Sequence, residues 1–167
     1  MSAGDRPGFS VDLPDVATTG EFGGHLAAAL PADTAGWMIL LEGDLGSGKS
    51  TLARALLRGL GFEGTVPSPT YTLVEPYDVQ GRTVYHIDLY RISGERDLPF
   101  LGWEDLRDGL MLIEWPERVP ALRGHADLLI SIDFAGDGRK ARLTAITERA
   151  ARLTKAEGIR GMGLVES

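Results

Sequence analysis

The chain contains no cysteine. Disulfide bonds, thiolate metal sites and a cysteine nucleophile are therefore excluded, and the composition fits a reducing cytoplasm. Long apolar runs are also absent: no stretch approaches the roughly 20 residues that cross a bilayer, so we expect no membrane association. The first 14 residues have neither a basic start nor an apolar segment, so no secretory signal is expected.

Acidic residues outnumber basic ones, 24 to 17, which gives a net charge of −7. Such a chain is poorly suited to wrapping nucleic acid by bulk electrostatics, so we expect no DNA partner, and any contact with RNA would need a local basic patch or another protein. Apolar residues make up 43% and charged residues 25% of the 167 positions, which is typical of a globular protein. We predict one domain over residues 1–150, followed by a partly flexible tail over 151–167.

The first half of the chain contains a strand, a glycine-rich loop and a helix in direct succession. Residues 15–30 show helical spacing of apolar side chains, and the continuous apolar run 37–42 is typical of a buried central strand. The loop 43–48 follows, and 49–61 is predicted to be helical because its leucines and alanines share one face. This order indicates an α/β fold of the P-loop NTPase type.

The second half of the chain predicts two hairpins and a further buried strand. Two prolines exclude helix near residue 68, and β-rich runs on either side of a turn at 78–81 predict an antiparallel hairpin. A second buried strand is expected over 109–116, a second hairpin over 126–148, and short helical turns over 94–109. We therefore predict a three-layer domain whose central sheet is mixed and contains antiparallel hairpins, with a frayed end from about residue 150.

The glycine-rich loop has the residue spacing of a phosphate-binding loop. Glycines let backbone N–H groups point at phosphates, and the start of the next helix adds its positive dipole end. Lys49 is expected to reach the β- and γ-phosphates, and the Ser50 hydroxyl to bind Mg²⁺. The candidate nucleotide-binding residues of this segment are Gly43, Asp44, Leu45, Gly46, Ser47, Gly48, Lys49, Ser50 and Thr51.

Two acidic residues end apolar strands elsewhere in the chain and could act beside this loop. Asp88 ends TVYHID and Glu114 ends LMLIE. Strand ends beside a phosphate loop collect its metal and water ligands. We expect Glu114 on the metal or its water shell and Asp88 on that shell or on the attacking water, and both are candidate catalytic residues with Lys49; the sequence leaves open which does which.

Two further residues near these acids have more than one interpretation. Thr70 lies in the segment SPTYT, where nucleotide hydrolases place a switch loop, so its hydroxyl could sense the γ-phosphate; alternatively it bonds its own backbone in a turn stiffened by proline. His86 alternates with its neighbours on a predicted strand, and packing or a structural hydrogen bond is the favoured interpretation.

The strings GDLGSGKST, VPSPTYTLVEPY, VYHIDLYR, LGWED and LIEWPER, in this order and spacing, resemble the TsaE (YjeE) family of bacterial ATPases in tRNA threonylcarbamoyladenosine biosynthesis. The resemblance runs from about residue 12 to 147. It implies a compact P-loop domain that binds ATP or ADP with Mg²⁺ and hydrolyses ATP weakly when alone. It also implies TsaB and TsaD as partners, with contact to tRNA only through them, and hydrolysis that resets their complex.

The resemblance also assigns individual residues. Lys49, Ser50, Asp88 and Glu114 match the phosphate, metal and catalytic positions of the family, although the family more often has Thr at the position of Ser50. Thr19 matches a threonine near the nucleotide, and Arg139 falls in a variable segment close to the base. The role of Trp115 is left open.

Three other functions share the phosphate loop. A small-molecule or nucleotide kinase is the main alternative, but the candidate lid, 91–107, is rich in acids as well as arginines, which suits a protein contact better than a phosphate clamp. A guanine-nucleotide switch lacks its Asn-Lys-x-Asp base reader here, since 154–157 reads Thr-Lys-Ala-Glu. A non-catalytic ATP-binding subunit is the third.

Overall fold

The computed structural model describes residues 6, 8–162 and 165–166. Its strands are β1 (Gly8–Leu13), β2 (Met38–Glu42), β3 (Val74–Val79), β4 (Arg82–Asp88), β5 (Leu110–Glu114), β6 (Leu128–Ala135), β7 (Gly138–Ala145) and β8 (Val165–Glu166). Its α-helices are α1 (Val16–Ala29), α2 (Lys49–Leu60), α3 (Glu148–Ala151) and α4 (Glu157–Arg160). Short 3₁₀ helices are η2 (Glu95–Leu101), η3 (Trp103–Asp108), η4 (Pro116–Arg118), η5 (Pro120–Gly124) and η6 (Leu153–Lys155).

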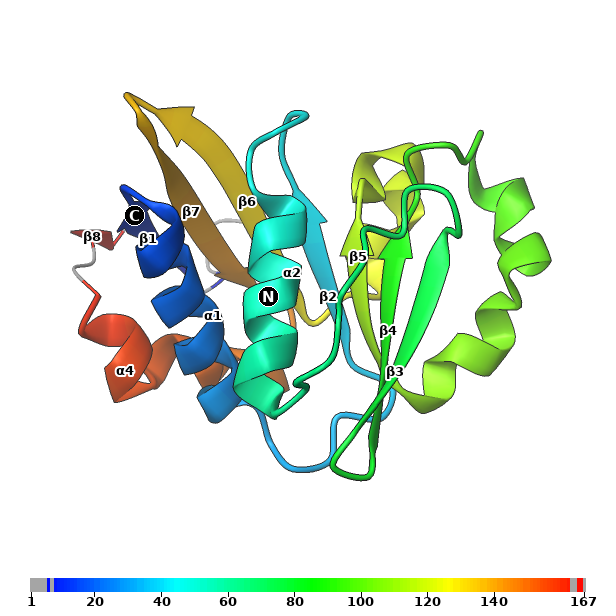
Figure 1. The fold of residues 1–167 in the computed structure, drawn as a ribbon, viewed down its shortest axis with the longest axis horizontal. Helices are drawn as coiled ribbons and strands as arrows, with labels where there is room; N and C mark the ends of the chain where they lie inside the picture. The colour runs from blue at the N-terminus through cyan, green and yellow to red at the C-terminus, as the bar shows by residue number, and fades with distance from the viewer. Residues whose placement is uncertain (1–5, 7, 163–164, 167) are drawn as a thin grey trace.

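All eight strands form one mixed sheet in the order β3-β4-β5-β2-β6-β7-β1-β8 (Figure 1). The central strands β4, β5, β2 and β6 are parallel, whereas the pairs β3–β4, β6–β7, β7–β1 and β1–β8 are antiparallel. The predicted α/β class, the mixed sheet and both hairpins are confirmed. The parallel centre matters for function because it brings the carboxyl ends of β4, β5 and β2 to one edge.

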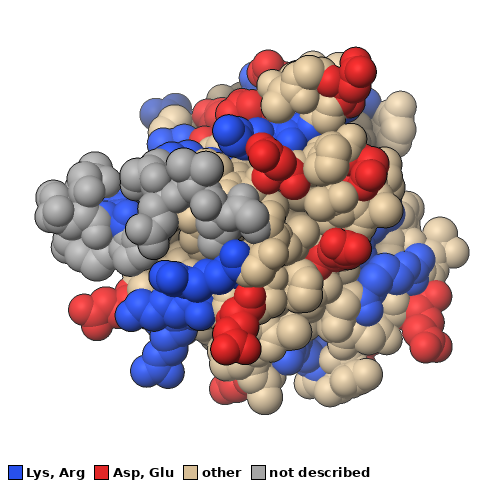
Figure 2. All heavy atoms as spheres, turned by 90° about the vertical axis from the view of Figure 1, so that its left-hand side faces the viewer, with Lys and Arg blue, Asp and Glu red and all other residues tan. Residues whose placement is uncertain are grey.

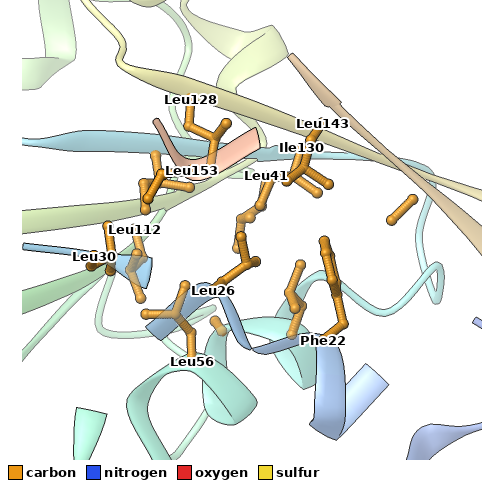
Figure 3. Packing of buried hydrophobic residues seen from close by; sticks show 14 of the residues in the cluster. Phe22, Leu26, Leu30, Leu41, Leu56, Leu112, Leu128, Ile130, Leu143 and Leu153 are labelled. Carbon is orange, nitrogen blue, oxygen red and sulfur yellow. The ribbon is translucent and has the colours of Figure 1, made fainter. Parts of the chain in front are cut away.

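The helices α1 and α2 pack against each other and cover one face of the sheet (Figure 1). Asp15 begins α1 by accepting a hydrogen bond from the Thr18 N–H at 2.8 Å, as expected of an N-cap. Gly61 ends α2 in the left-handed conformation with φ of 109°. Gly59 lies inside α2. Labelled members of the core between helices and sheet are Phe22, Leu26, Leu30, Leu41, Leu56, Leu112, Leu128, Ile130, Leu143 and Leu153 (Figure 3).

A second apolar cluster lies on the other face of the sheet. Alternation along β2 places Ile39 and Leu41 in the core under the helices and Met38 and Leu40 in this second cluster. The segments on either side of β5, 91–109 and 115–124, cover it with the buried side chains of Ile92, Leu98, Leu106, Val119 and Leu122. The helical turns predicted over 94–109 are therefore present, as η2 and η3.

Two strands, β1 and β8, were not predicted; they extend the sheet beyond β7. Beyond residue 147, α3, η6 and α4 form compact turns in which Leu153 and Ile159 are buried. The partly flexible tail expected over 151–167 stays a prediction. Side chains of 163–167 lie outside the described residues. Within the described part of the chain, no helix is both long and apolar enough to cross a membrane.

Candidate functional site

The loop between β2 and α2 has the conformation that its glycines permit. Gly43, Gly46 and Gly48 have φ angles of 153°, 79° and 109°, which L-residues rarely adopt. A Cβ at Gly43 would lie 2.5 Å from both the Ile132 carbonyl oxygen and Ser47 Oγ. The loop is thus closely packed at its base, and α2 begins at Lys49 with its N-terminal N–H groups at the loop.

The Lys49 side chain lies inside this loop and is 4% exposed. Its Nζ donates to the carbonyl oxygens of Gly43 at 2.6 Å and Asp44 at 3.0 Å, and it lies 4.0 Å from the centroid of the Trp115 ring. Burial lowers the pKa of the Lys49 ammonium, and nearby carboxylates, led by Glu114, oppose that shift. Among the described residues the hydrogen bonds of this buried cation go to neutral carbonyls, so it is well placed to bind an anion.

Ser50 and Glu114 are brought together from positions 64 residues apart. Ser50 Oγ donates to Glu114 Oε1 at 2.9 Å and to Oε2 at 3.0 Å. The contact arises because β5 lies beside β2 in parallel, so that Glu114 ends its strand where the loop after β2 turns into α2. Glu114 is only 3% exposed.

Asp88 ends β4 beside Glu114, with which it is paired in the sheet register. Its Oδ2 accepts from the Thr70 hydroxyl at 3.2 Å, and its Oδ1 accepts from the Tyr90 N–H at 2.8 Å. The Thr70 hydroxyl also lies 2.8 Å from that of Ser68. These side-chain contacts tie the segment 68–72 to the acidic strand end, in place of the bonds to its own backbone that one interpretation predicted.

Two cavities flank the loop. The first, about 280 Å³, is lined by Leu45, Gly46, Gly48, Lys49, Ser50, Thr51, Ser68, Thr70, Asp88, Glu114 and Trp115. The second, about 200 Å³, is lined by Leu13, Pro14, Asp15, Val16, Thr19, Gly46, Ser47, Gly48, Thr51, Ile132, Asp137, Gly138 and Arg139. The first carries the lysine, hydroxyls and acids that suit phosphates, and the second contains Thr19 and Arg139. Arg139 Nη2 also donates to the Gly46 carbonyl at 3.2 Å.

The residues at these cavities fit a magnesium nucleotide. Ser47 Oγ is buried and has no hydrogen-bond partner among the described residues, so a ligand or water is needed to satisfy it. Ser50, Asp88 and Glu114 offer the hard oxygen ligands that Mg²⁺ prefers. Among the described residues no group of three or more His, Cys, Asp or Glu could hold a metal alone.

Two further residues lie at the site: His86, for which packing or a structural hydrogen bond was the favoured interpretation and is confirmed, and Trp115, whose role was left open. His86 is fully buried, and its Nε2 lies 2.5 Å from Glu114 Oε2. Trp115 follows Glu114 with a left-handed φ of 58°, which places its ring against Lys49 and 4.9 Å from that of Tyr90. The sequence held one signal for His86: it precedes Asp88 by two residues and therefore shares its face of the strand.

Comparison with known proteins gives a family match across most of the chain. Residues 13–143 match the family model described as "Threonylcarbamoyl adenosine biosynthesis protein TsaE". The "tRNA threonylcarbamoyladenosine biosynthesis protein TsaE" of Haemophilus influenzae is 44% identical over 121 residues, which cover 71% of this chain and 77% of that protein. The protein of the same name from Streptomyces coelicolor is 36% identical over 141 residues, 78% of this chain and 93% of its own.

A solved structure has the same fold. The crystal structure of YdiB from Bacillus subtilis superposes with a TM-score of 0.74 and 26% sequence identity, over 95% of this chain and 98% of that one.

Proposed function

The chain belongs to the family of threonylcarbamoyl adenosine biosynthesis protein TsaE, and from that premise we propose that it is a Mg²⁺-dependent ATPase supporting threonylcarbamoyl adenosine formation in tRNA. One observation carries the proposal. A single loop holds a buried lysine and a hydroxyl bonded to a strand-end carboxylate, with a second strand-end carboxylate beside it. Phosphoryl transfer needs little else from a protein than such positioned charges.

The loop binds the phosphates of ATP in this proposal. Its backbone N–H groups and the start of α2 face them, and the Lys49 ammonium exchanges the Gly43 and Asp44 carbonyls for phosphate oxygens. That exchange is favourable because a bond between two charged groups is stronger than one to a neutral carbonyl. Thr19 and Arg139, at the second cavity, contact the nucleoside end.

Glu114 and Asp88 have different roles in this proposal. Bound Mg²⁺ neutralises phosphate charge, and Ser50 and Glu114 are the residues that hold it. Asp88 contributes to the water shell or orients the attacking water, and its bond to Thr70 connects it to the segment 68–72. Thr70 is thereby placed to register whether a γ-phosphate is present.

Water is the phosphoryl acceptor in this proposal, and the products are ADP and phosphate. The protein works beside TsaB and TsaD in the cytoplasm, and its hydrolysis resets their complex between rounds of tRNA modification. Contact with tRNA is made through that complex.

The alternatives have less support. No residue of 91–107, the candidate kinase lid, lines the first cavity, which contains Lys49. That segment instead packs Ile92, Leu98 and Leu106 against the sheet face opposite the helices α1 and α2. The segment 154–157 cannot read guanine in its observed place, because Thr154 is buried and its hydroxyl donates to the Ala151 carbonyl at 2.6 Å.

Phosphate release from ATP tests the proposed function. Purified protein is expected to release phosphate slowly with Mg²⁺ and faster once TsaB and TsaD are added. Lys49→Ala and Glu114→Ala are each expected to lower the rate by about 10²-fold, because each removes a charge that acts in a largely dry site. A phosphorylated small molecule in place of free phosphate would instead support the kinase alternative.

A further inference from the structure

His86 occupies a position in β4 where an apolar side chain would be expected. Val84, His86 and Asp88 are every second residue of β4, so they share the sheet face that α2 covers. Val84 belongs to the apolar core on that face. His86 has an exposed fraction of 0%, and its Nδ1 has no hydrogen-bond partner among the described residues. An incompletely satisfied polar group in a core destabilises the fold, so stability alone does not explain a histidine at this position.

The contact that His86 makes is with Glu114. The imidazole Nε2 lies 2.5 Å from Glu114 Oε2, diagonally across the parallel pair β4–β5. Glu114 also accepts from Ser50 Oγ at both of its oxygens. A carboxylate can only accept a hydrogen bond, so with Glu114 in that form the imidazole Nε2 is the donor of this contact.

The donors to the two acids differ. Asp88 is held by the Tyr90 N–H and the Thr70 hydroxyl, one on each oxygen. Glu114 has Ser50 and His86 as its hydrogen-bond donors among the described residues. In the proposed function the Ser50 oxygen binds Mg²⁺ through a lone pair while its single O–H can still donate, so the present donation shared between both Glu114 oxygens has to be rearranged when nucleotide binds. His86 is then the donor that still fixes the orientation of the carboxylate.

We infer that His86 is a positioning residue. Its Nε2–H keeps the Glu114 carboxylate directed at Ser50 and at the first cavity, which contains Lys49, when Ser50 also binds the metal. The inference rests on the proposed function, because it assigns His86 a role through Glu114 at that site. A buried partner that orients a metal-binding carboxylate typically changes metal affinity or activity 10–100-fold when it is removed.

Substitutions that differ in reach test this role. In His86→Gln the amide N–H can occupy roughly the place of Nε2, whereas the shorter His86→Asn cannot reach Glu114. Both keep a polar side chain of similar burial cost, and thermal unfolding checks that each is folded. Calorimetry then measures ADP affinity with and without Mg²⁺, and phosphate release gives the turnover rate and its Mg²⁺ dependence.

For His86→Asn we expect the gain in ADP affinity on adding Mg²⁺ to fall by about tenfold or more, and turnover to fall about 10–100-fold. ADP affinity without Mg²⁺ should stay within about threefold of wild type, because the loop and Lys49 are untouched. His86→Gln should recover most of both losses. If Gln and Asn behave alike, whether both match wild type or both are impaired, the inference is overturned.

A double-mutant cycle with Glu114→Gln separates positioning from a general structural effect. If His86 acts through Glu114, His86→Asn adds little to the loss already caused by Glu114→Gln. Additive losses would contradict the inference. Failure of the proposed function is seen separately: a wild-type protein without Mg²⁺-dependent ADP binding and hydrolysis overturns both, whereas a normal wild type, an impaired Glu114→Gln and an unaffected His86→Asn overturn the role of His86 alone.

Discussion

Asp127 is the buried acid that joins three segments at the end of the sheet opposite the phosphate loop. Its carboxylate accepts from the Met38 N–H, the Thr147 hydroxyl and the Arg149 guanidinium at 2.7 to 3.0 Å. Burial raises the pKa of Asp127, but the bonds from Arg149, Met38 and Thr147 outweigh it and hold the pKa below its ordinary value.

Asp127→Asn is expected to lower the free energy of unfolding by about 2–3 kcal/mol at pH 7, because charge-assisted bonds to a buried carboxylate are lost. The depressed pKa gives the sign of the pH dependence. The contribution of Asp127 is fully present above the ordinary aspartate pKa of about 4 and is lost as the pH falls through the lower pKa of the folded protein. Urea unfolding of both proteins between pH 7 and pH 3 measures it.

The matched control is Asp12→Asn. The Asp12 pair with Lys140 is 4.0 Å long and exposed on both sides, so less than about 0.5 kcal/mol should be lost. A wild-type advantage over Asp127→Asn that stays constant down to pH 3, or a loss no larger than that of the control, would contradict the assignment of Asp127.

At the scale of elements, the close approach of α1 and α2 sets how the loop and the second cavity lie together. A Cβ at Gly23 of α1 would lie 2.4 Å from Ala55 Cβ and within 3 Å of the α2 backbone. At Gly20, one turn earlier, nothing lies within 4 Å. In α1, therefore, Gly23 is in close contact with α2, whereas Gly20 has open space beside it.

Gly23→Ala is expected to destabilise the fold by about 1–3 kcal/mol, because overpacking outweighs the gain in helix propensity of about 1 kcal/mol. Gly20→Ala should instead raise stability by about 0.5–1 kcal/mol. Thermal unfolding of the two variants decides the matter. Equal effects of one sign would show that contact between the helices does not require a glycine at position 23.

The elements that could be predicted from sequence are those with strong local patterns. The apolar run before the loop, the helix after it and the strands around the turn at 78–81 were predicted to within a few residues. Strand β1 was missed although its apolar residues Phe9, Val11 and Leu13 alternate with polar ones, which is a strand pattern. The short strand β8 is defined by its pairing with β1. The turns over 148–160 combine a local signal, the Thr147 cap of α3, with burial of Leu153 and Ile159, which the sequence pattern does not show.

At the site, too, some residues could be proposed from the sequence and others depend on tertiary structure. Lys49, Ser50, Asp88 and Glu114 could be proposed because each lies at a fixed place beside a strand end, and the structure brings all four to one cavity. The contact of His86 with Glu114 depends on the register between β4 and β5, which the sequence does not state. The stacking of Trp115 on Lys49 depends on a left-handed φ at a residue that is not glycine.

At the scale of the whole molecule, charge is unevenly distributed. Residues 139–160 include Arg139, Lys140, Arg142, Arg149, Arg152, Lys155 and Arg160 but only Glu148 and Glu157 as acids. Lys and Arg side chains gather on part of the face at the β8 and α4 end, with acids elsewhere on it (Figure 2). The chain as a whole nevertheless has a net charge of −7, so this segment is more basic than the rest.

The protein alone is expected to bind tRNA weakly at most, and to lose that binding at about 150 mM salt, because the local excess of basic residues belongs to a chain of net charge −7 and salt weakens its contacts with phosphates. Gel-shift titrations of tRNA at low and physiological salt measure this, with TsaB and TsaD added as the comparison. Stable binding of tRNA by the protein alone at physiological salt would contradict the expectation that tRNA is contacted through partners.

In the proposed function the loop and its cavities hold an adenine nucleotide through Lys49, and calorimetric titration measures this binding. With Mg²⁺ present, ADP should bind in preference to GDP, and Lys49→Ala should weaken ADP binding about 10- to 150-fold, the equivalent of about 1.5–3 kcal/mol for a charge-assisted bond. Equal affinity for ADP and GDP would contradict the adenine assignment, and wild-type affinity in Lys49→Ala would contradict the site itself.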